Sequence, residues 1–332
     1  MLHCTPPSSD RSLCPAAAPL SAVSGILIVD KPENCTSFSV VKEVQKLLGL
    51  NRVGHCGTLD PFATGVLVLC LNRATRIADQ LLEQDKRYRF TIRFGFESDT
   101  LDRTGTIAAI YDGPPPSEAV LEECLACFRG THEQQVPRYA AVRVGGQRLY
   151  AWSRKGIAIP RPRRKVTIHS LGLLAYRWPE AILEVHCSKG TYIRQLAADI
   201  GKTLQCGAYV NQLRRLASGP FVIAQAVSLE GLREAREKAC WQERVISMNQ
   251  ALGHLPLIRI DAPERVKRLQ DGQVDPGLES ELQQRFAGQT NPVRLAAGNN
   301  ELVALWWPRE NGQKQRHLRV FGADPRDHTL LS

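Results

Sequence analysis

The segment GHCGTLDPFATGVLVLCL (54–71) joins a loop rich in glycine and turn-forming residues to an uninterrupted apolar run. Its pattern predicts a loop over 51–65 and a buried strand over 65–71. The glycines let the backbone take a positive φ or approach a ligand closely. Because Asp60 lies just before the apolar run, we expect the loop to be anchored in the core, with this carboxylate beside apolar surface.

Asp60 has two interpretations. A carboxylate beside apolar surface needs a cationic partner, and an Asp next to an Arg stays ionised. Such an anion can act as a nucleophile or a base. The alternative is an Asx turn that precedes Pro61, and the local sequence favours neither interpretation.

The rest of the chain alternates between strand and helix patterns. Strands are predicted over 25–32, 88–96, 165–176 and 181–190, and helices over 37–50, 74–84, 117–130 and 191–205. Elements that alternate in this way predict an α/β or α+β domain with a mixed sheet.

The two ends of the chain differ from its middle. Residues 1–24 are rich in Pro, Ser and Ala and are predicted to form a disordered tail. After about residue 245 the pattern changes to a strand, a short helix, a glycine turn and two more strands. We therefore predict a main domain over 25–247 and a small β-rich C-terminal domain over 248–332.

The net charge of +10 comes from one part of the chain. Residues 136–179 contain no Asp or Glu and hold the ten basic residues Arg138, Arg143, Arg148, Arg154, Lys155, Arg161, Arg163, Arg164, Lys165 and Arg177. Such a segment indicates a polyanionic partner, with nucleic acid favoured, because each phosphate neutralised releases counterions. The alternative is a solvated loop. Within it, 136–165 is predicted as extended loop with one short helix near 149–156.

Composition excludes several classes of protein. With 43% hydrophobic and 23% charged residues, the chain is globular rather than disordered or fibrous. Its apolar runs are shorter than the roughly 18 residues of a membrane span. Ten cysteines in 332 residues are too few for a disulfide scaffold, so we expect free thiols. Cys124 and Cys127 lack a second ligand pair at zinc spacing.

The stretch SKGTYIR (188–194) is a second unusual motif, a strand end that turns into a helix. Backbone N–H groups at a helix start, with Lys189 beside them, suit a phosphate, and Tyr192 and Arg194 could both face a cleft. A glycine turn with surface basic residues is the alternative. Tyr88, at the start of its strand, could stack on a base or could be an ordinary strand former.

These motifs carry a resemblance. GILIVDKPENCTS, GHCGTLDPFATGVL, DKRY, SDTLDRTG, CSKGTYIR and CGAYVNQLRRL occur in the order typical of the TruB family of tRNA pseudouridine synthases, and over 25–225 the chain resembles that family in its bacterial stand-alone form. The C-terminal part resembles a small RNA-binding PUA domain. The resemblance implies a mixed central sheet with flanking helices, a basic RNA-gripping insertion over 136–165 and a PUA-like C-terminal domain.

The resemblance also implies roles for individual residues. Asp60 matches the nucleophile, and Arg194 matches its ion-pair partner. Tyr88 matches the residue that stacks on the target base and takes part in proton removal. The other residues expected to line the pocket of the flipped nucleotide are His55, Tyr192 and Leu213. The residues expected to contact the tRNA backbone are Lys31, Arg161, Arg163, Arg164 and Lys189.

The sequence departs from the family pattern in two places. Asn34 stands where the family usually has Gly, an exchange that Asn tolerates because it also visits the left-handed region. Residues 137–143 read PRYAAVR where family members commonly read PPxYSAxK. This second difference lies in the expected RNA-gripping region, and it leaves the catalytic residues themselves unchanged.

The implied reaction converts the T-loop uridine of tRNA (conventional position 55) to pseudouridine. It requires no redox change, phosphoryl transfer or group donor, so we expect no cofactor and no metal. The expected partner is the T-arm of tRNA, bound by a cytoplasmic monomer that requires no protein partner and no membrane. A guide-RNA-dependent synthase and an RNA-folding chaperone are the alternatives. The basic segment favours the stand-alone enzyme, and Asp60, Tyr88 and Arg194 count against a chaperone alone.

Overall fold

The computed structural model describes residues 23–309 and 317–322, apart from 141, 145, 150, 151, 153–156 and 158. The predicted tail, apart from its last two residues, and most of the short helix predicted near 149–156 lie outside the described residues. Among the described helices, none is long and apolar enough to cross a membrane.

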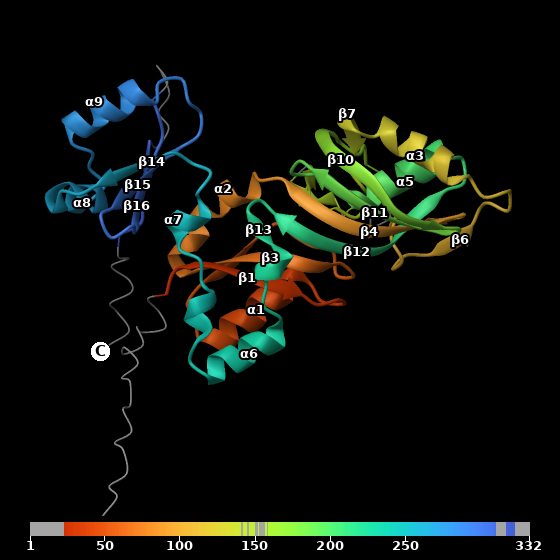
Figure 1. Cartoon of the computed structure of the whole chain (residues 1–332), viewed down its shortest axis with the longest axis horizontal. Helices are drawn as coiled ribbons and strands as arrows, with labels where there is room; N and C mark the ends of the chain where they lie inside the picture. Colours follow the sequence, from red (N-terminus) through yellow and green to blue (C-terminus); the bar gives the residue numbers. More distant parts are fainter. Residues whose placement is uncertain are drawn as a thin grey trace, which may run out of the picture.

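Within the described residues, a mixed sheet of nine strands forms the centre of the molecule (Figure 1). Its order is β1 (Gly25–Lys31), β3 (Thr64–Leu71), β12 (Ala208–Ser218), β4 (Lys86–Phe94), β11 (Glu180–Cys187), β10 (Arg163–Arg177) and β7 (Gly130–Gln135), with β2 (Val53–Cys56) on β3 and β13 (Phe221–Val222) on β12. The β3–β12 pair is parallel, and the other pairs of this sheet are antiparallel. The predicted mixed sheet is thereby confirmed.

Strand β3 is buried on both faces, as its apolar run predicts. Leu67 and Leu69 pack toward α1 (Ser37–Leu48) and α6 (Leu229–Glu237). Val66 and Val68 pack toward the other side, where η2 (Asn72–Ile77), α2 (Ala78–Leu82) and α7 (Met248–Ala251) lie. Thr36 caps α1 by accepting a hydrogen bond from the Ser39 N–H.

The second half of the sheet, which contains β4, β11 and β10, is covered by helices on one face. Helices α3 (Glu118–Cys127) and α5 (Ile193–Thr203) pack their buried residues against β4, β11 and β10. The opposite face carries exposed pairs such as Arg89–Glu184. Phe62 of the glycine-rich loop joins this second core, so the loop is anchored as expected.

The two halves of the sheet meet where β3 begins beside β12. Gly65 has a φ of +102°, and a Cβ there would lie 2.2 Å from the Arg215 carbonyl oxygen. Only glycine allows this close approach, since any side chain would push the two strands apart. The loop that holds Asp60 enters the sheet at this junction.

The segment 51–65 is not all loop, contrary to the prediction. Residues Val53–Cys56 form β2, which pairs antiparallel with β3 from Val53↔Leu71 to Cys56↔Val68. Its pattern is too short to reveal a strand, and its hydrogen-bond partners lie more than ten residues away along the chain. Two further small hairpins lie outside the main sheet, β5 (Phe96–Ser98) with β6 (Ile107–Ala109) and β8 (Arg143–Val144) with β9 (Gln147–Arg148).

The C-terminal module, residues 257–322, contains more helix than predicted. It comprises β14 (Leu257–Ile260), α8 (Pro263–Gln270), α9 (Pro276–Arg285), β15 (Val293–Ala297), β16 (Leu302–Trp306) and β17 (Leu318–Val320), in one sheet of order β14-β15-β16-β17. The sequence pattern did not predict α9 or β15. The short segments η3 (Ile223–Gln225) and η4 (Trp241–Arg244) precede the module.

Candidate active site

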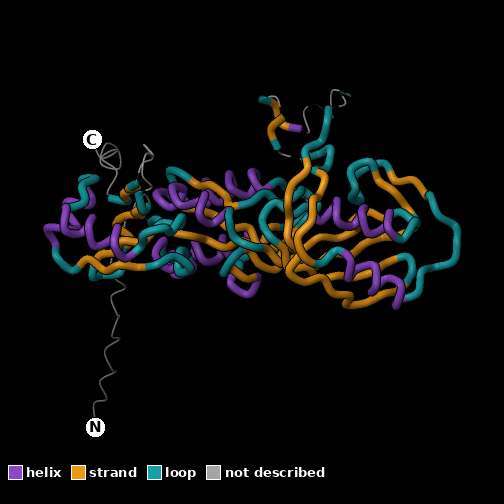
Figure 2. The backbone as a smooth tube through the Cα atoms, turned by 90° about the horizontal axis from the view of Figure 1, so that it is seen from above, coloured by secondary structure: helices purple, strands orange, loops and turns teal. Residues whose placement is uncertain are grey.

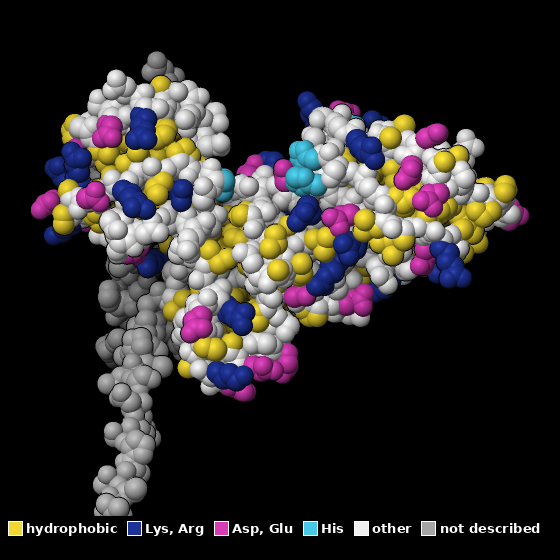
Figure 3. Space-filling model, viewed as in Figure 1, with side chains coloured by type: hydrophobic (Ala, Val, Ile, Leu, Met, Phe, Trp, Pro, Cys, Tyr) yellow, Lys and Arg dark blue, Asp and Glu magenta, His cyan; other side chains and the backbone are white. Residues whose placement is uncertain are grey.

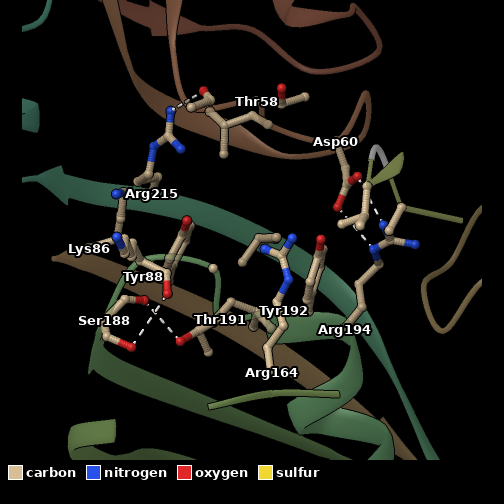
Figure 4. Close-up of a pocket in the computed structure, with 18 of the residues that line it drawn as sticks. Thr58, Asp60, Lys86, Tyr88, Arg164, Ser188, Thr191, Tyr192, Arg194 and Arg215 are labelled. Atoms are coloured by element: carbon tan, nitrogen blue, oxygen red, sulfur yellow. Dashed lines mark hydrogen bonds and ion pairs between the residues drawn. The ribbon is translucent and has the colours of Figure 1, made fainter. Parts of the chain in front are cut away.

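A cavity of about 620 Å³ opens at the junction of the two sheet halves (Figure 4). It is lined by Asp60 and its loop, by the start of β4, by β12 and by the turn that leads into α5. Arg164, at the start of β10, also reaches it. Residues far apart in the sequence therefore converge on one space, whose volume is in the usual range for small-ligand sites.

Three side chains hold the backbone of the Asp60 loop. Lys31 Nζ donates to the Pro61 carbonyl oxygen at 3.1 Å, and Arg215 Nη2 donates to the Gly57 carbonyl oxygen at 3.1 Å. Ser37 Oγ accepts from the Leu59 N–H at 2.9 Å. These contacts fix the loop on both sides of Asp60, so the carboxylate is presented by a rigid backbone.

Lys31 is not a surface contact for RNA, contrary to expectation. Its side chain is fully buried, and its ammonium group also donates to the carbonyl oxygens of Pro32 and Cys35, each at 2.8 Å. Burial lowers the pKa of Lys31. An ammonium group bonded to carbonyl oxygens inside the protein has no access to a phosphate, so Lys31 is a structural residue of the loop.

Asp60 and Arg194 form a two-point ion pair. Arg194 Nε lies 2.9 Å from Asp60 Oδ2, and Arg194 Nη2 donates to Asp60 Oδ1 at 3.1 Å. The Arg194 side chain is 5% exposed, whereas that of Asp60 is 35% exposed. The guanidinium is therefore fixed in the interior while the carboxylate remains open to the cavity, and Figure 4 shows the two side chains facing one another.

Asp102 is a second carboxylate on the same guanidinium, and the sequence analysis missed it. Its Oδ2 lies 3.5 Å from Arg194 Nη1, and its side chain is 5% exposed. Its Oδ1 accepts hydrogen bonds from the Thr104 N–H at 2.9 Å and from the Thr104 hydroxyl at 2.6 Å. The turn sequence SDTLDRTG signals such a side-chain-capped loop, but its distance from Arg194 along the chain conceals the pairing.

Opposing influences act on the pKa of the Asp60 carboxyl. Burial raises the pKa of the Asp60 carboxyl above its ordinary value, and Asp102 acts in the same direction. Arg194, and more weakly Lys31, act to lower it. The expected ion pair is present, yet burial is the largest influence, so Asp60 is a more basic carboxylate than a solvated one.

Tyr88 lies on the cavity wall between Lys86 and the α5 turn (Figure 4). Burial raises the pKa of the Tyr88 hydroxyl, while the nearby Arg215 acts to lower it. Burial also lowers the pKa of Lys86 to about 8, followed by the charge of Arg215. At neutral pH Tyr88 is accordingly a neutral phenol with an aromatic face at the cavity.

The three other residues expected at the pocket differ in position. Tyr192 and Leu213 line the cavity, and Gln134 fixes Tyr192 by bonding both its N–H (2.8 Å) and its carbonyl oxygen (3.0 Å). His55 lies on β2 and is not part of the described lining. Its Nδ1 is buried without a partner, and burial lowers its pKa, so the ring is neutral.

The predicted backbone contacts occupy different environments. Arg163 is exposed and lies 3.7 Å from Glu133, whereas Arg161 is half-buried and donates to Gln135 at 2.6 Å. Lys189 is half-exposed and paired with Glu83. Arg164 and Lys189 both line the cavity, and the Arg164 side chain points into it (Figure 4).

The described part of the basic segment stands out from the rest of the molecule. Figure 2 shows a short piece of backbone with strand structure raised above the main body of the molecule. Val136, Ala140 and Leu149 form a small buried cluster against Tyr192, which attaches the base of this segment beside the cavity. The segment is therefore positioned next to the candidate active site.

Comparison with known proteins supplies the family relation. Residues 45–193 match the model of the TruB family pseudouridylate synthase N-terminal domain, and residues 194–253 match the tRNA pseudouridylate synthase B C-terminal domain. A tRNA pseudouridine synthase B of Syntrophobacter fumaroxidans is 52% identical over 90% of this chain and 97% of its own length. One from Syntrophotalea carbinolica is 43% identical over 74% of this chain and 80% of its own.

A solved structure shares the fold at lower identity. A chain of a Cbf5–Nop10–Gar1 complex aligns with a TM-score of 0.63 and 24% identity, over 89% of this chain and 83% of that chain.

Proposed function

The chain belongs to the TruB family of pseudouridylate synthases, and we propose that it converts the T-loop uridine at position 55 of tRNA to pseudouridine, with Asp60 as nucleophile and without a guide RNA. The carrying observation is the Asp60–Arg194 pair, in which a fixed guanidinium holds a carboxylate at the wall of a nucleotide-sized cavity. We place this activity in the cytoplasm, in a monomer that needs no protein partner.

The reaction is an isomerisation that balances without a co-reactant. The N1–C1′ bond of uridine breaks, the uracil turns while it is held in the cavity, and a C5–C1′ bond forms. The proton at C5 is lost and N1 gains one. Asp60, made more basic by burial, is the anion that attacks, and Arg194 holds it in position and stabilises its charge.

Access to the target base requires base flipping. Extruding a nucleotide from folded RNA costs a few kcal/mol. Stacking on the aromatic face of Tyr88 returns about 1–3 kcal/mol of that cost. A neutral Tyr88 hydroxyl suits the stacking role directly, whereas removal of the C5 proton by the same group requires the phenolate, which burial disfavours and Arg215 favours.

Recognition of the tRNA depends on charge beside the cavity. Arg163 and Arg164 at the start of β10, together with Lys189, present cations to a phosphate backbone. We assign the grip on the T-arm to this set and to the insertion over 136–165. The C-terminal module, as a PUA-like domain, is proposed to add a second RNA contact.

The decisive experiment uses an unmodified tRNA transcript with no guide RNA, in the presence of a metal chelator. We expect pseudouridine at the T-loop uridine with the native chain. Asp60→Asn preserves the size of the side chain and is expected to abolish product while tRNA binding stays within a few-fold. Product elsewhere in the tRNA would refute the assigned position, and product from Asp60→Asn would refute the nucleophile.

A further inference from the structure

A cluster of two histidines and one aspartate lies outside the candidate active site. His169 Nε2 is 3.1 Å from Asp85 Oδ2, and His186 Nε2 is 3.8 Å from the same oxygen. The centroids of the two imidazole rings are 4.7 Å apart. One potential ligand atom from each of the three side chains lies within 4.8 Å of the other two. We propose that Asp85, His169 and His186 form a binding site for a divalent transition-metal ion, with Zn²⁺ as the best-fitting ion.

The backbone is shaped to bring these side chains together. In the β10–β11 ladder, Ser170 pairs with His186 and Ile168 pairs with Cys187, so the register shifts at His169. The shift leaves His169 as the extra residue of a β-bulge, a feature that redirects a side chain. Without it, His169 would point to the opposite face from Ser170 and His186.

Asp85 reaches the same place from the neighbouring strand. His186 pairs with Arg87 of β4, and residues two apart on a strand share a face. Asp85, just before β4, therefore lies diagonally across from His186, within reach of a side-chain contact. Strands β10 and β11 thus supply one ligand each, and the residue that precedes β4 supplies the third. The Gly219 N–H donates to the Asp85 carbonyl oxygen at 2.8 Å, which fixes the backbone of this third ligand.

The cluster is separate from the cavity. Lys86 and Tyr88 of β4 face the cavity, so Arg87 and its partner His186 face the other side of the sheet. The three side chains are 38–46% exposed, which gives an ion direct access from solvent. Figure 3 shows histidine side chains grouped at the surface beside the notch between the two lobes of the molecule.

The ligand chemistry selects the ion. Two imidazole nitrogens and one carboxylate oxygen suit Zn²⁺ and its neighbours, whereas Mg²⁺ and Ca²⁺ prefer sets made of oxygen. Ligand atoms around tetrahedral zinc are about 3.3 Å apart, given bonds of about 2.0–2.1 Å. The two His–Asp85 separations of 3.1 and 3.8 Å lie close to that value, and the two histidine nitrogens, within 4.8 Å of each other, would move together by side-chain rotation.

Metal binding replaces the interactions present without it. The ion takes the place of the His169–Asp85 contact, and both imidazoles bind it through an unprotonated ring nitrogen. Water completes the coordination, because the described cluster offers three protein ligands. The ion ties β4, β10 and β11 together at the end of the sheet next to the Ser188–Thr191 turn that lines the cavity.

The test is a Co²⁺ and Zn²⁺ titration of the untagged full chain after treatment with chelator. We expect one Zn²⁺ per chain by calorimetry, and Co²⁺ absorption in the visible range typical of four-coordination by nitrogen and oxygen. His169→Ala or His186→Ala is expected to weaken binding by at least about tenfold, because loss of even an outer-sphere partner of a metal ligand costs 10- to 100-fold.

The controls separate this site from other ligands of the chain. His132→Ala changes a histidine of the same sheet on β7 and is expected to leave the affinity unchanged. Binding by a thiol such as the exposed Cys127 would give a sulfur-to-cobalt charge-transfer band in the near ultraviolet. Three outcomes would each overturn the proposal. They are a titration without one-site binding, the appearance of the thiolate charge-transfer band, and an affinity of His169→Ala equal to that of the native protein.

The substituted side chains are partly exposed, so we expect the variants to fold, with unchanged circular dichroism in chelator. Zn²⁺ should raise the Tm of the native chain and of His132→Ala but not that of His186→Ala, because an ion that binds the folded state stabilises it. An equal rise in all three would place the ion elsewhere and refute the assigned ligands.

Discussion

Arg194 is shared between two carboxylates, and this arrangement gives Asp102 a testable role. Asp102 receives two hydrogen bonds from Thr104 and holds the far side of the guanidinium. We expect Asp102→Asn to reduce the single-turnover rate by roughly 10- to 100-fold, since a hydrogen bond to a charged group contributes about 1.5–3 kcal/mol. Affinity for tRNA should change little.

The matched control for Asp102 is Asp99→Asn in the same turn. Asp99 is exposed, and within the described residues it accepts a hydrogen bond from the Thr106 N–H rather than from Arg194. The single-turnover rate of Asp99→Asn should equal that of the native chain. A rate for Asp102→Asn that is as high as that of Asp99→Asn would exclude Asp102 as a positioning residue.

The pKa of Asp60 sets the acid limit of activity. Burial raises this pKa above its ordinary value, and Arg194 opposes the shift. The proposed nucleophile is the Asp60 anion, so we expect activity to be lost as pH falls through the raised pKa. We expect the acid limb of the single-turnover rate to lie above about pH 3.9, the value of a solvated Asp. A limb at or below that value would mean that the ion pair outweighs burial.

Two substitutions of Tyr88 separate its two proposed roles. Tyr88→Phe keeps the aromatic face and removes the hydroxyl, whereas Tyr88→Leu removes both. If stacking is the main contribution, Tyr88→Phe should bind substrate tRNA as the native chain does, and Tyr88→Leu should lose about 1–3 kcal/mol of affinity for the flipped state. The two roles are distinguished by measuring the turnover rate of each variant and its affinity for a tRNA that carries a base analogue at the target position. A complete loss of turnover in Tyr88→Phe would instead assign proton transfer to the hydroxyl.

At the scale of residues, the motifs identified two side chains that the structure pairs, but they misjudged the supporting side chains. Asp60 and Arg194 stand in distinctive motifs, and the structure brings them to 2.9 Å. Lys31 also stands in a motif, yet its sequence does not reveal that its ammonium group is turned inward onto Pro61. Asp102 is invisible as a partner because pairing across the fold is a tertiary property.

At the scale of elements, the start of β10 concentrates the basic residues. Neutralising Arg161, Arg163 and Arg164 to Gln should weaken tRNA binding and flatten its dependence on salt, with a slope reduced by up to about 2 when expressed as log Kd against log salt. The reduction is less than three full contacts, because Arg161 is already bonded to Gln135. Binding measured across a salt series tests this.

Arg177→Gln at the other end of β10 provides the control for this element. It removes an exposed arginine from the same strand, far from the cavity. Its salt slope should match that of the native chain. If the triple substitution gave the same slope as Arg177→Gln, the three arginines would have no phosphate role.

Elements with long, regular patterns were predictable, and elements defined by their partners were not. Helix α1 and strand β3 carry clear periodicity and a clear cap or apolar run. Strand β2 is four residues long and exists because β3 supplies its hydrogen bonds. Helix α9 buries two leucines on an otherwise polar sequence, so its amphipathic signal is weak.

At the scale of the whole molecule, the C-terminal module is joined to the rest by a shared core. Leu302, Leu305 and Phe321 pack in one cluster with Ile26 of β1 and Leu252. Polar contacts reinforce the junction, since Arg319 Nη1 lies 2.9 Å from Asp79 and Arg73 Nη1 donates to the Phe321 carbonyl oxygen at 2.9 Å. The sequence boundary near 248 marks a change of pattern, but the packing is continuous across it.

Because the packing is continuous, we expect a substitution in the shared cluster to destabilise both the C-terminal module and the elements it packs against. Leu305→Ala removes a fully buried side chain from the shared cluster and should cost about 2–5 kcal/mol. Hydrogen exchange should then accelerate in β1 and α7 as well as in β16. Leu282→Ala, which opens an equally buried position in the module's own core, should accelerate exchange within the module alone. A shared core transmits the loss of stability to both sides of the junction. If the backbone amides of β1 and α7 kept their protection from hydrogen exchange in Leu305→Ala, the module would open independently of the rest.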